Sequence, residues 1–142
     1  MGEERRFFEA FEALTRVTGI EDVGYHIIVD GKLTPKYKTD SKQLDDASWK
    51  EVHSQHSVKV EENPVLLEVI NEKKTVVIND TSVDRRSYET FALFGINSIM
   101  VIPVLEQDVV KGIIVVASIE ALHQFTPEEQ QASEEIVNRL FA

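Results

Sequence analysis

The first segment of the chain carries a helical hydrophobic pattern. Between about Glu3 and Thr18, apolar residues recur with the 3.6-residue period of an α-helix, and Gly19 follows as a C-terminal stop signal. The residues on the apolar face are Phe7, Phe8, Phe11 and Leu14. The pattern therefore predicts a helix that packs against other parts of the protein with one face.

A β-hairpin is predicted next. Apolar side chains occupy alternate positions from Val23 to Val29 and from Leu33 to Tyr37, which is the period of a strand. Asp30-Gly31 lies between the two segments, and this dipeptide favours a type I′ turn. Pro35 and the repeated lysines of the second segment are typical of a strand at the edge of a sheet.

The middle of the chain combines one weak pattern with three clearer ones. Residues 40–62 are mostly polar, and a short helix fits them only around Ala47–His53. Asn63-Pro64 favours the start of a helix, and the β-branched run from Thr75 to Ile78 favours a short strand. A second short helix is predicted from Asp84 to about Phe94.

Two long strands and a capped helix complete the pattern. The strands, Ser98–Leu105 and Val109–Ser118, are apolar on both faces through their middles, which indicates a sheet that is covered on both sides. Thr126, Pro127 and Glu129 form a capping box that predicts the start of the closing helix. The order of elements predicts an α+β fold with a central sheet between helices and a second layer.

Composition narrows the class of protein. The chain has 142 residues, of which 42% are hydrophobic and 28% charged, as in a single globular domain. Its net charge of -10 disfavours direct binding to nucleic acid. The most apolar stretches, 98–105 and 112–119, are too short to cross a membrane. The chain has no cysteine, which excludes disulfides and fits a reducing compartment, so we predict a cytoplasmic protein.

Five segments in this order resemble a GAF domain. They are residues 63–70, 75–80, 95–104, 110–118 and 125–129. The resemblance is strongest from Pro64 to Phe141. It includes the Gly-x-x-Ser that begins at Gly95, Pro103 near the end of that strand, and Gly112 in the next strand. It implies an α/β/α layered, profilin-like fold with an antiparallel sheet of five or six strands. The N- and C-terminal helices would cover one face, and short helices and loops would cover a pocket on the other.

The resemblance also implies a function. Family members are mostly regulatory modules, so residues 1–142 are expected to form a single sensor domain that belongs to a longer regulatory protein. A small-molecule ligand would bind between the sheet and its roof and would signal through the terminal helices, which often pair into a homodimer, to an output domain. Two alternatives are a ligand-free dimerisation or scaffold domain and a haem- or metal-binding sensor.

The chemistries known in the family can be compared with these residues. Cyclic-nucleotide-binding members carry an Asn-Lys-Phe-Asp-Glu signature, and Asn71, Lys73 and Phe91 are present here without the Asp-Glu pair. Reduction of free methionine sulfoxide and covalent attachment of a bilin both need cysteine, which is absent. The sequence contains no recognisable nucleophilic triad, phosphate-binding glycine loop or carboxylate pair. We therefore predict ligand binding without enzymatic activity.

The residues predicted to line the pocket are mostly aromatic, because aromatic walls suit planar or apolar ligands. They are Tyr25, Ile27, Tyr37, Trp49, Arg85, Tyr88, Phe91, Phe94, Ser98 and Met100. A plain core position is an equal alternative for Tyr25 and Phe91. Trp49 either closes the roof or lies at a subunit contact. Arg85 more often lies on the surface, and Ser98 has the alternative of satisfying backbone groups where its strand begins.

Two further sets of residues have a functional and a structural interpretation. The predicted dimer contacts are Phe7, Phe8, Phe11, Ile136 and Leu140, although the phenylalanines also suit a helix that simply covers the sheet. His26 is either a haem ligand or, more commonly, a core histidine held by a hydrogen bond. His53 and His56 have the spacing of metal ligands, but two solvated loop residues are the commoner arrangement. We therefore predict no metal site and no haem.

Overall fold

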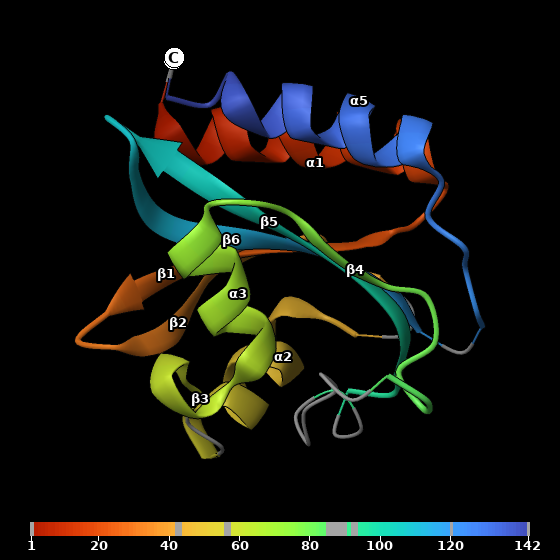
Figure 1. Cartoon of the computed structure of the whole chain (residues 1–142), viewed down its shortest axis with the longest axis horizontal. Coiled ribbons are helices and arrows are strands. Elements are labelled where there is room, and N and C mark those ends of the chain that lie inside the picture. Colours follow the sequence, from red (N-terminus) through yellow and green to blue (C-terminus); the bar gives the residue numbers. More distant parts are fainter. Residues whose placement is uncertain are drawn as a thin grey trace.

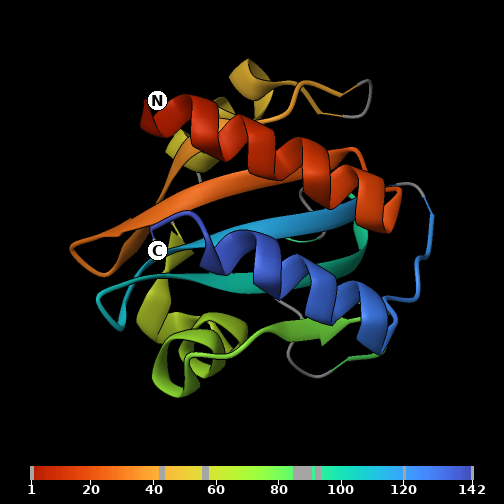
Figure 2. The same ribbon diagram turned by 90° about the horizontal axis from the view of Figure 1, so that it is seen from above.

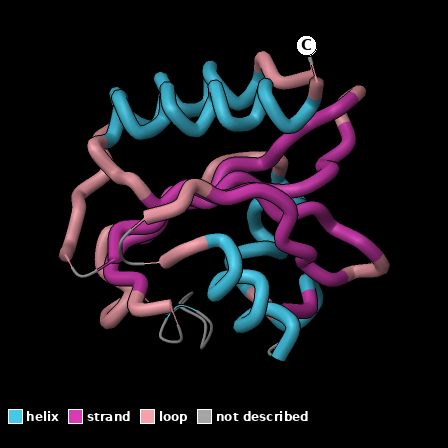
Figure 3. Tube along the Cα trace, turned by 180° about the vertical axis from the view of Figure 1, so that it is seen from behind, coloured by secondary structure: helices cyan, strands magenta, loops and turns pink. Residues whose placement is uncertain are grey.

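The protein has a three-layer α+β fold. The computed structural model describes residues 2–41, 44–55, 58–84, 91, 94–119 and 121–141. Helices α1 (Glu3–Thr18) and α5 (Pro127–Asn138) lie on one face of the sheet, and α2 (Asp46–Gln55) and α3 (Pro64–Glu72) lie on the other (Figure 1, Figure 3). The predicted fold class and the position of the terminal helices are confirmed.

The sheet is antiparallel, and the described residues form six strands in the order β3-β2-β1-β6-β5-β4. The strands are β1 (Asp22–Val29), β2 (Lys32–Lys38), β3 (Val58–Lys59), β4 (Val76–Ile78), β5 (Ile96–Glu106) and β6 (Val109–Ile119). Among the described residues, β3 pairs with β2 at Lys32 and Leu33, so β3 takes the edge of the sheet there and the edge position predicted for β2 is corrected for these two residues. The three long strands β1, β6 and β5 form the centre of the sheet.

The local signals in the sequence form the structures that they predict. Thr126 accepts a hydrogen bond from the Glu129 amide, and the Glu129 carboxylate accepts one from the Thr126 amide, which completes the capping box of α5. Asn63 Oδ1 accepts from the amides of the first turn of α3. Asp30 and Gly31 have φ angles of 51° and 74°, as the two central residues of a type I′ turn require.

The helix layer is packed tightly onto the sheet. α1 and α5 lie side by side and run in opposite directions across it (Figure 2). Phe7 is 1% exposed and stacks on Tyr25 of β1 with ring centroids 4.1 Å apart. The Arg6 guanidinium donates to the Leu140 carbonyl and links α1 to the segment that follows α5. No helix in the described part of the chain is long and apolar enough to span a membrane.

The opposite face of the sheet is covered by a layer of short elements, called the roof below. It consists of α2, β3, the 3₁₀ turn Val60–Glu62 and α3. Val65, Leu66 and Val69 of α3 pack with Ile99 and Ile113 of the sheet in a second hydrophobic cluster. The helix predicted from Asp84 to Phe94 falls mostly outside the described residues, which in this stretch are Asp84, Phe91 and Phe94.

Candidate functional site

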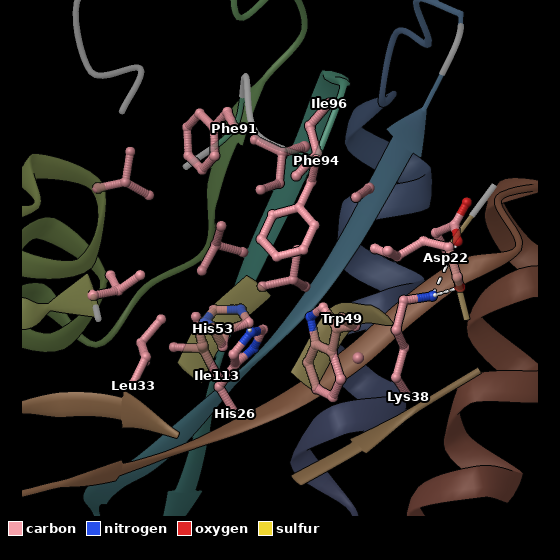
Figure 4. A pocket seen from close by; sticks show the side chains of 18 of the residues that line it. Asp22, His26, Leu33, Lys38, Trp49, His53, Phe91, Phe94, Ile96 and Ile113 are labelled. Carbon is pink, nitrogen blue, oxygen red and sulfur yellow. Dashed lines mark hydrogen bonds and ion pairs between the residues drawn. The ribbon is translucent and has the colours of Figure 1, made fainter. Parts of the chain in front are cut away.

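A cavity of about 70 Å³ lies between the sheet and the roof (Figure 4). The sheet contributes Gly24, His26, Leu33, Lys38, Ile96, Ile99, Val101, Ile113, Val115, Ala117 and Ile119 to its wall, and Asp22 joins them at the start of β1. The remaining residues are Leu44, Trp49, His53, Val58, Asn63, Val65, Leu66, Phe91 and Phe94. The cavity is about half the size of the cavity of about 150 Å³ that holds benzene. A ligand larger than a few heavy atoms therefore requires an outward movement of the roof.

The alternation of β1 decides which of its side chains reach the cavity. Gly24 and His26 line the cavity, whereas Val23 and Tyr25 belong to the core under α1 and α5. The pairing of β1 with β2 shifts register between Tyr25 and His26, and such bulges re-aim side chains near functional sites. A Cβ at Gly24 would lie 3.2 Å from the Trp49 ring, so the missing side chain makes room for the indole.

The aromatic part of the wall is built around two histidines. Trp49 and His53 lie one turn apart on α2 and face the sheet, where the His53 Nε2 atom is 3.1 Å from His26 Nε2. The His26 ring lies 4.9 Å from the Trp49 ring, and the His53 ring lies 5.3 Å from the Phe94 ring. The expected core hydrogen bond of His26 is thus confirmed.

The expectation that His53 is solvated is wrong. Its side chain is only 8% exposed, because α2 packs its Trp49–His53 face onto the sheet. His56 lies outside the described residues. Among the residues that the structure describes, no group of three or more histidine, cysteine, aspartate or glutamate side chains is arranged to hold a metal ion.

Burial controls the protonation of the histidine pair. Desolvation and the neighbouring His53 lower the pKa of His26 well below its usual value. Desolvation also lowers the pKa of His53 to about 4. Both rings are therefore neutral at pH 7, and their Nε2–Nε2 contact is a hydrogen bond between neutral imidazoles.

A buried ion pair closes the other end of the cavity wall. Lys38 Nζ lies 3.0 Å from Asp22 Oδ1, and the two residues are 5% and 6% exposed. The ammonium group also donates to the carbonyls of Thr39 and Leu44, and Ser41 Oγ donates to Asp22 Oδ1. The three ammonium donors are thereby used, and the chain that leads from β2 toward α2 is tied to β1.

Of the predicted pocket residues that the structure describes, three line this cavity, namely Trp49, Phe91 and Phe94. Trp49 closes the roof, which was one of its two expected roles. Tyr25, Ile27, Tyr37 and Met100 pack on the other face of the sheet, with the terminal helices. Their predicted place at the pocket is corrected, because the hydrophobic pattern shows which residues share a face and does not show which layer covers that face.

Ser98, the last of the predicted pocket residues that the structure describes, is not part of the cavity wall. Ser98 is fully buried, donates to the Asn79 carbonyl and accepts from the His123 amide, so it satisfies backbone groups near the start of β5. Arg85 and Tyr88 lie outside the described residues. The polar wall residues that were not among the predicted pocket residues are Asp22, His26, Lys38, His53 and Asn63, and most of the apolar wall was not predicted either. The i,i+4 spacing of Trp49 and His53 in the short helix predicted around Ala47–His53 is the sequence signal that places both side chains on one helix face.

Most of the predicted dimer contacts are buried within the chain itself. Phe7 and Phe11 are each 1% exposed, and Leu140 is 6% exposed. Their assignment as subunit contacts is corrected, because α1 and α5 use these side chains to cover the sheet. Phe8 is 38% exposed, and Ile136 is partly buried.

The sequence of this chain also matches the model of a known protein family. The family model of the GAF domain matches residues 3–140. The chain belongs to the GAF domain family. Among curated proteins, no sequence matches this domain.

Solved structures of GAF domains share the fold at low sequence identity. The GAF domain/HD domain protein of Geobacter sulfurreducens is 12% identical with a TM-score of 0.79, and the match covers 97% of this chain and 88% of that one. The type II free methionine-R-sulfoxide reductase of Thermoplasma acidophilum is 17% identical with a TM-score of 0.72, over 97% and 89%. A GAF domain of Synechocystis in its photoproduct state is 10% identical with a TM-score of 0.75, over 99% and 92%. At these identities the likeness establishes the fold.

Proposed function

We propose that this GAF domain is a regulatory sensor module. It binds a small molecule in the cavity between the sheet and the roof, and it passes the binding energy to an output domain of a longer cytoplasmic regulatory protein. The observation that carries the proposal is the cavity itself, whose wall combines apolar side chains with a few buried polar ones. That combination is typical of small-molecule sites, where apolar area supplies affinity and polar groups supply orientation.

The strands offer a direct route from the cavity to the terminal helices. His26 of β1 lies in the cavity wall, and the preceding residue, Tyr25, stacks under Phe7 of α1. A ligand that shifts β1 or β6 therefore changes the surface on which α1 and α5 pack. A differential affinity of about 1–3 kcal/mol for one helix arrangement is sufficient for such a switch.

The same site supports binding without catalysis. The reductase from Thermoplasma acidophilum shares the fold at 17% identity, and the present chain has no cysteine to supply thiol chemistry. The described part of the wall contains two histidines that bond to each other and one ion pair, in which Lys38 and Asp22 already interact. We therefore propose that the cavity retains its ligand unchanged.

A ligand-free scaffold is the second candidate function, and the small volume of about 70 Å³ favours it. Either function is compatible with a homodimer, for which the exposed Phe8 on α1 is the proposed contact. Sedimentation velocity checks this point: the Phe8→Ser variant is expected to remain monomeric at concentrations where the parent chain dimerises. A monomeric parent chain would contradict the dimer proposal.

A screen of metabolites by thermal shift and hydrogen exchange tests the sensor proposal. A ligand is expected to raise Tm and to slow amide exchange in residues 44–55 and 58–72, the roof segments that border the cavity. Exchange in α1 and α5 is expected to change as well, because the proposal requires coupling to these helices. A thermal shift with no change in α1 and α5 would support binding and oppose signalling through the helices.

Two neighbouring residues of β6 provide a matched pair of variants. Ala117 lines the cavity, and Val116 faces the terminal helices. Ala117→Leu is expected to fill the cavity and abolish the ligand-induced shift, and Val116→Leu is expected to retain it. If no compound in the panel shifts Tm of the parent chain, the scaffold function replaces the sensor function.

A further inference from the structure

The cavity wall contains two histidine rings whose free hydrogen-bonding groups are buried. His26 Nε2 lies 3.1 Å from His53 Nε2, and the two side chains are 5% and 8% exposed. The rings lie together on the wall, His26 from β1 and His53 from α2 (Figure 4). The Nδ1 atom of each ring is buried and has no hydrogen-bond partner among the described residues. Such atoms are costly to bury, so the pair is suited to a partner that enters the cavity.

The contact between the rings determines what they offer to that partner. A neutral imidazole carries one N–H and one bare nitrogen. The Nε2–Nε2 hydrogen bond therefore requires one ring with its proton on Nε2 and one ring with a bare Nε2. The first ring keeps a bare Nδ1, and the second carries its proton on Nδ1. The pair thus presents one acceptor and one donor.

The rest of the described wall favours an uncharged organic partner. Asp22 and Lys38 neutralise each other, and the Lys38 donors are used within the chain, so neither charge is available to an ionic ligand. A metal-binding histidine almost always donates its second nitrogen to a carboxylate or a carbonyl. Neither Nδ1 atom does so here.

We propose that His26 and His53 together recognise a small, uncharged heteroaromatic ligand, to which the pair donates one hydrogen bond and from which it accepts another. This proposal rests on the proposed function, because it concerns the same cavity. The Trp49 and Phe94 rings lie 4.9 Å from His26 and 5.3 Å from His53, and they supply flat apolar walls for an aromatic body. The volume of about 70 Å³ restricts the ligand to a single small ring unless the roof moves.

The first test measures the tautomers of the parent chain and needs no ligand. Long-range ¹H–¹⁵N NMR spectra at pH 7 distinguish the Nδ1–H and Nε2–H forms of each histidine, and the His53→Phe variant assigns the signals. The proposal expects one Nδ1–H ring and one Nε2–H ring in the His26–His53 pair. It is overturned if both rings have the same tautomer or if either ring is charged.

The second test compares three planar five-membered rings of similar size by NMR titration. Pyrazole has one donor and one acceptor, pyrrole has a donor only, and thiophene has neither. The proposal expects pyrazole to bind at least about fivefold more tightly than either of the other two rings, because each lost hydrogen bond is worth about 1 kcal/mol. The ¹⁵N signals of both Nδ1 atoms are expected to shift when pyrazole binds.

Variants separate recognition by the pair from general effects on the fold. His53→Phe keeps an aromatic ring in the wall and is expected to abolish the preference for pyrazole. His123→Gln is the matched control, because His123 bonds to Glu129 at the start of α5, away from the cavity wall, and it is expected to keep the preference.

The outcomes distinguish this proposal from the proposed function. Equal binding of the three rings leaves the cavity as a binding site and overturns recognition by the histidines. Binding of none of the rings also overturns it, even where another compound of the metabolite panel shifts Tm of the parent chain.

Discussion

The two faces of the sheet differ in how completely the layers that cover them fill the space. On the helix face, Phe7 and Tyr25 stack within a continuous core that the terminal helices close. On the roof face, a cavity remains, and His26 and His53 each keep one buried nitrogen without a partner among the described residues. Both faces belong to the same strands, so the difference comes from the layers that cover them.

The difference indicates that stability and recognition are separated across the sheet. A core in which apolar side chains interdigitate tolerates few changes and has one arrangement. A layer of short elements with buried polar groups has lower local stability and is the part of a protein that moves when a ligand binds. We therefore expect the helix face to provide most of the stability of the fold, and the roof to move when a ligand binds.

The largest expected effect is on the helix face. Phe7→Ala removes a fully buried ring and is expected to lower the free energy of unfolding by about 4 kcal/mol, measured by urea denaturation. Phe8→Ala is the matched control on the same helix, and it is expected to cost less than about 1.5 kcal/mol because Phe8 is 38% exposed. Equal losses in the two variants would contradict the assignment of Phe7 to the core.

The buried ion pair gives the next largest effect, on the roof face. Lys38→Met leaves the Asp22 carboxylate buried without its partner and is expected to cost about 3–4 kcal/mol. Lys36→Met removes the more exposed pair with Glu3 and is expected to cost less than about 1 kcal/mol. Chemical denaturation of both variants at pH 7 checks this, and a small effect at Lys38 would show that the wall adapts to a missing charge.

Acid is expected to destabilise the roof face through His53. The folded protein keeps His53 neutral down to a pKa of about 4, whereas the unfolded chain takes up the proton near pH 6.5. Stability is therefore fully present above pH 6.5 and falls by about 2–3 kcal/mol as the pH decreases to about 4. The lowered pKa of His26 adds to the effect in the same direction.

Denaturation curves between pH 7 and pH 4 measure this effect. The His53→Gln variant is expected to have a smaller slope of stability against pH than the parent chain. A parent curve without a slope in this range would contradict the neutral buried pair.

The smallest expected effects come from two helix caps, one on each face. Asn63→Ala removes the cap of α3, and Thr126→Ala removes the cap of α5, each at a cost of about 1 kcal/mol. Native-state hydrogen exchange separates the two variants. Asn63→Ala is expected to speed exchange mainly in the roof, and Thr126→Ala is expected to speed it across the molecule. The same exchange pattern in both variants would remove the distinction between the faces.

The sequence predicts the local elements well, because their signals act over a few residues. The Asp30-Gly31 turn, the Asn63 cap and the Thr126–Glu129 capping box each combine neighbouring side chains with neighbouring backbone groups. The long strands also follow from the pattern. The same pattern does not distinguish the faces of β5, where Ile99 and Val101 line the cavity and Met100 packs with the terminal helices.

The sequence by itself determined the order of elements, the doubly covered sheet and membership of the GAF family, since these depend on periodicity and short motifs. The tertiary structure alone decided that Tyr25 faces the helices and His26 the cavity, and that His26 meets His53, which is 27 residues later. The physical reason is that strand alternation is symmetric. Only the packing of a second layer, Phe7 on one side and Trp49 on the other, gives the two faces of β1 different environments.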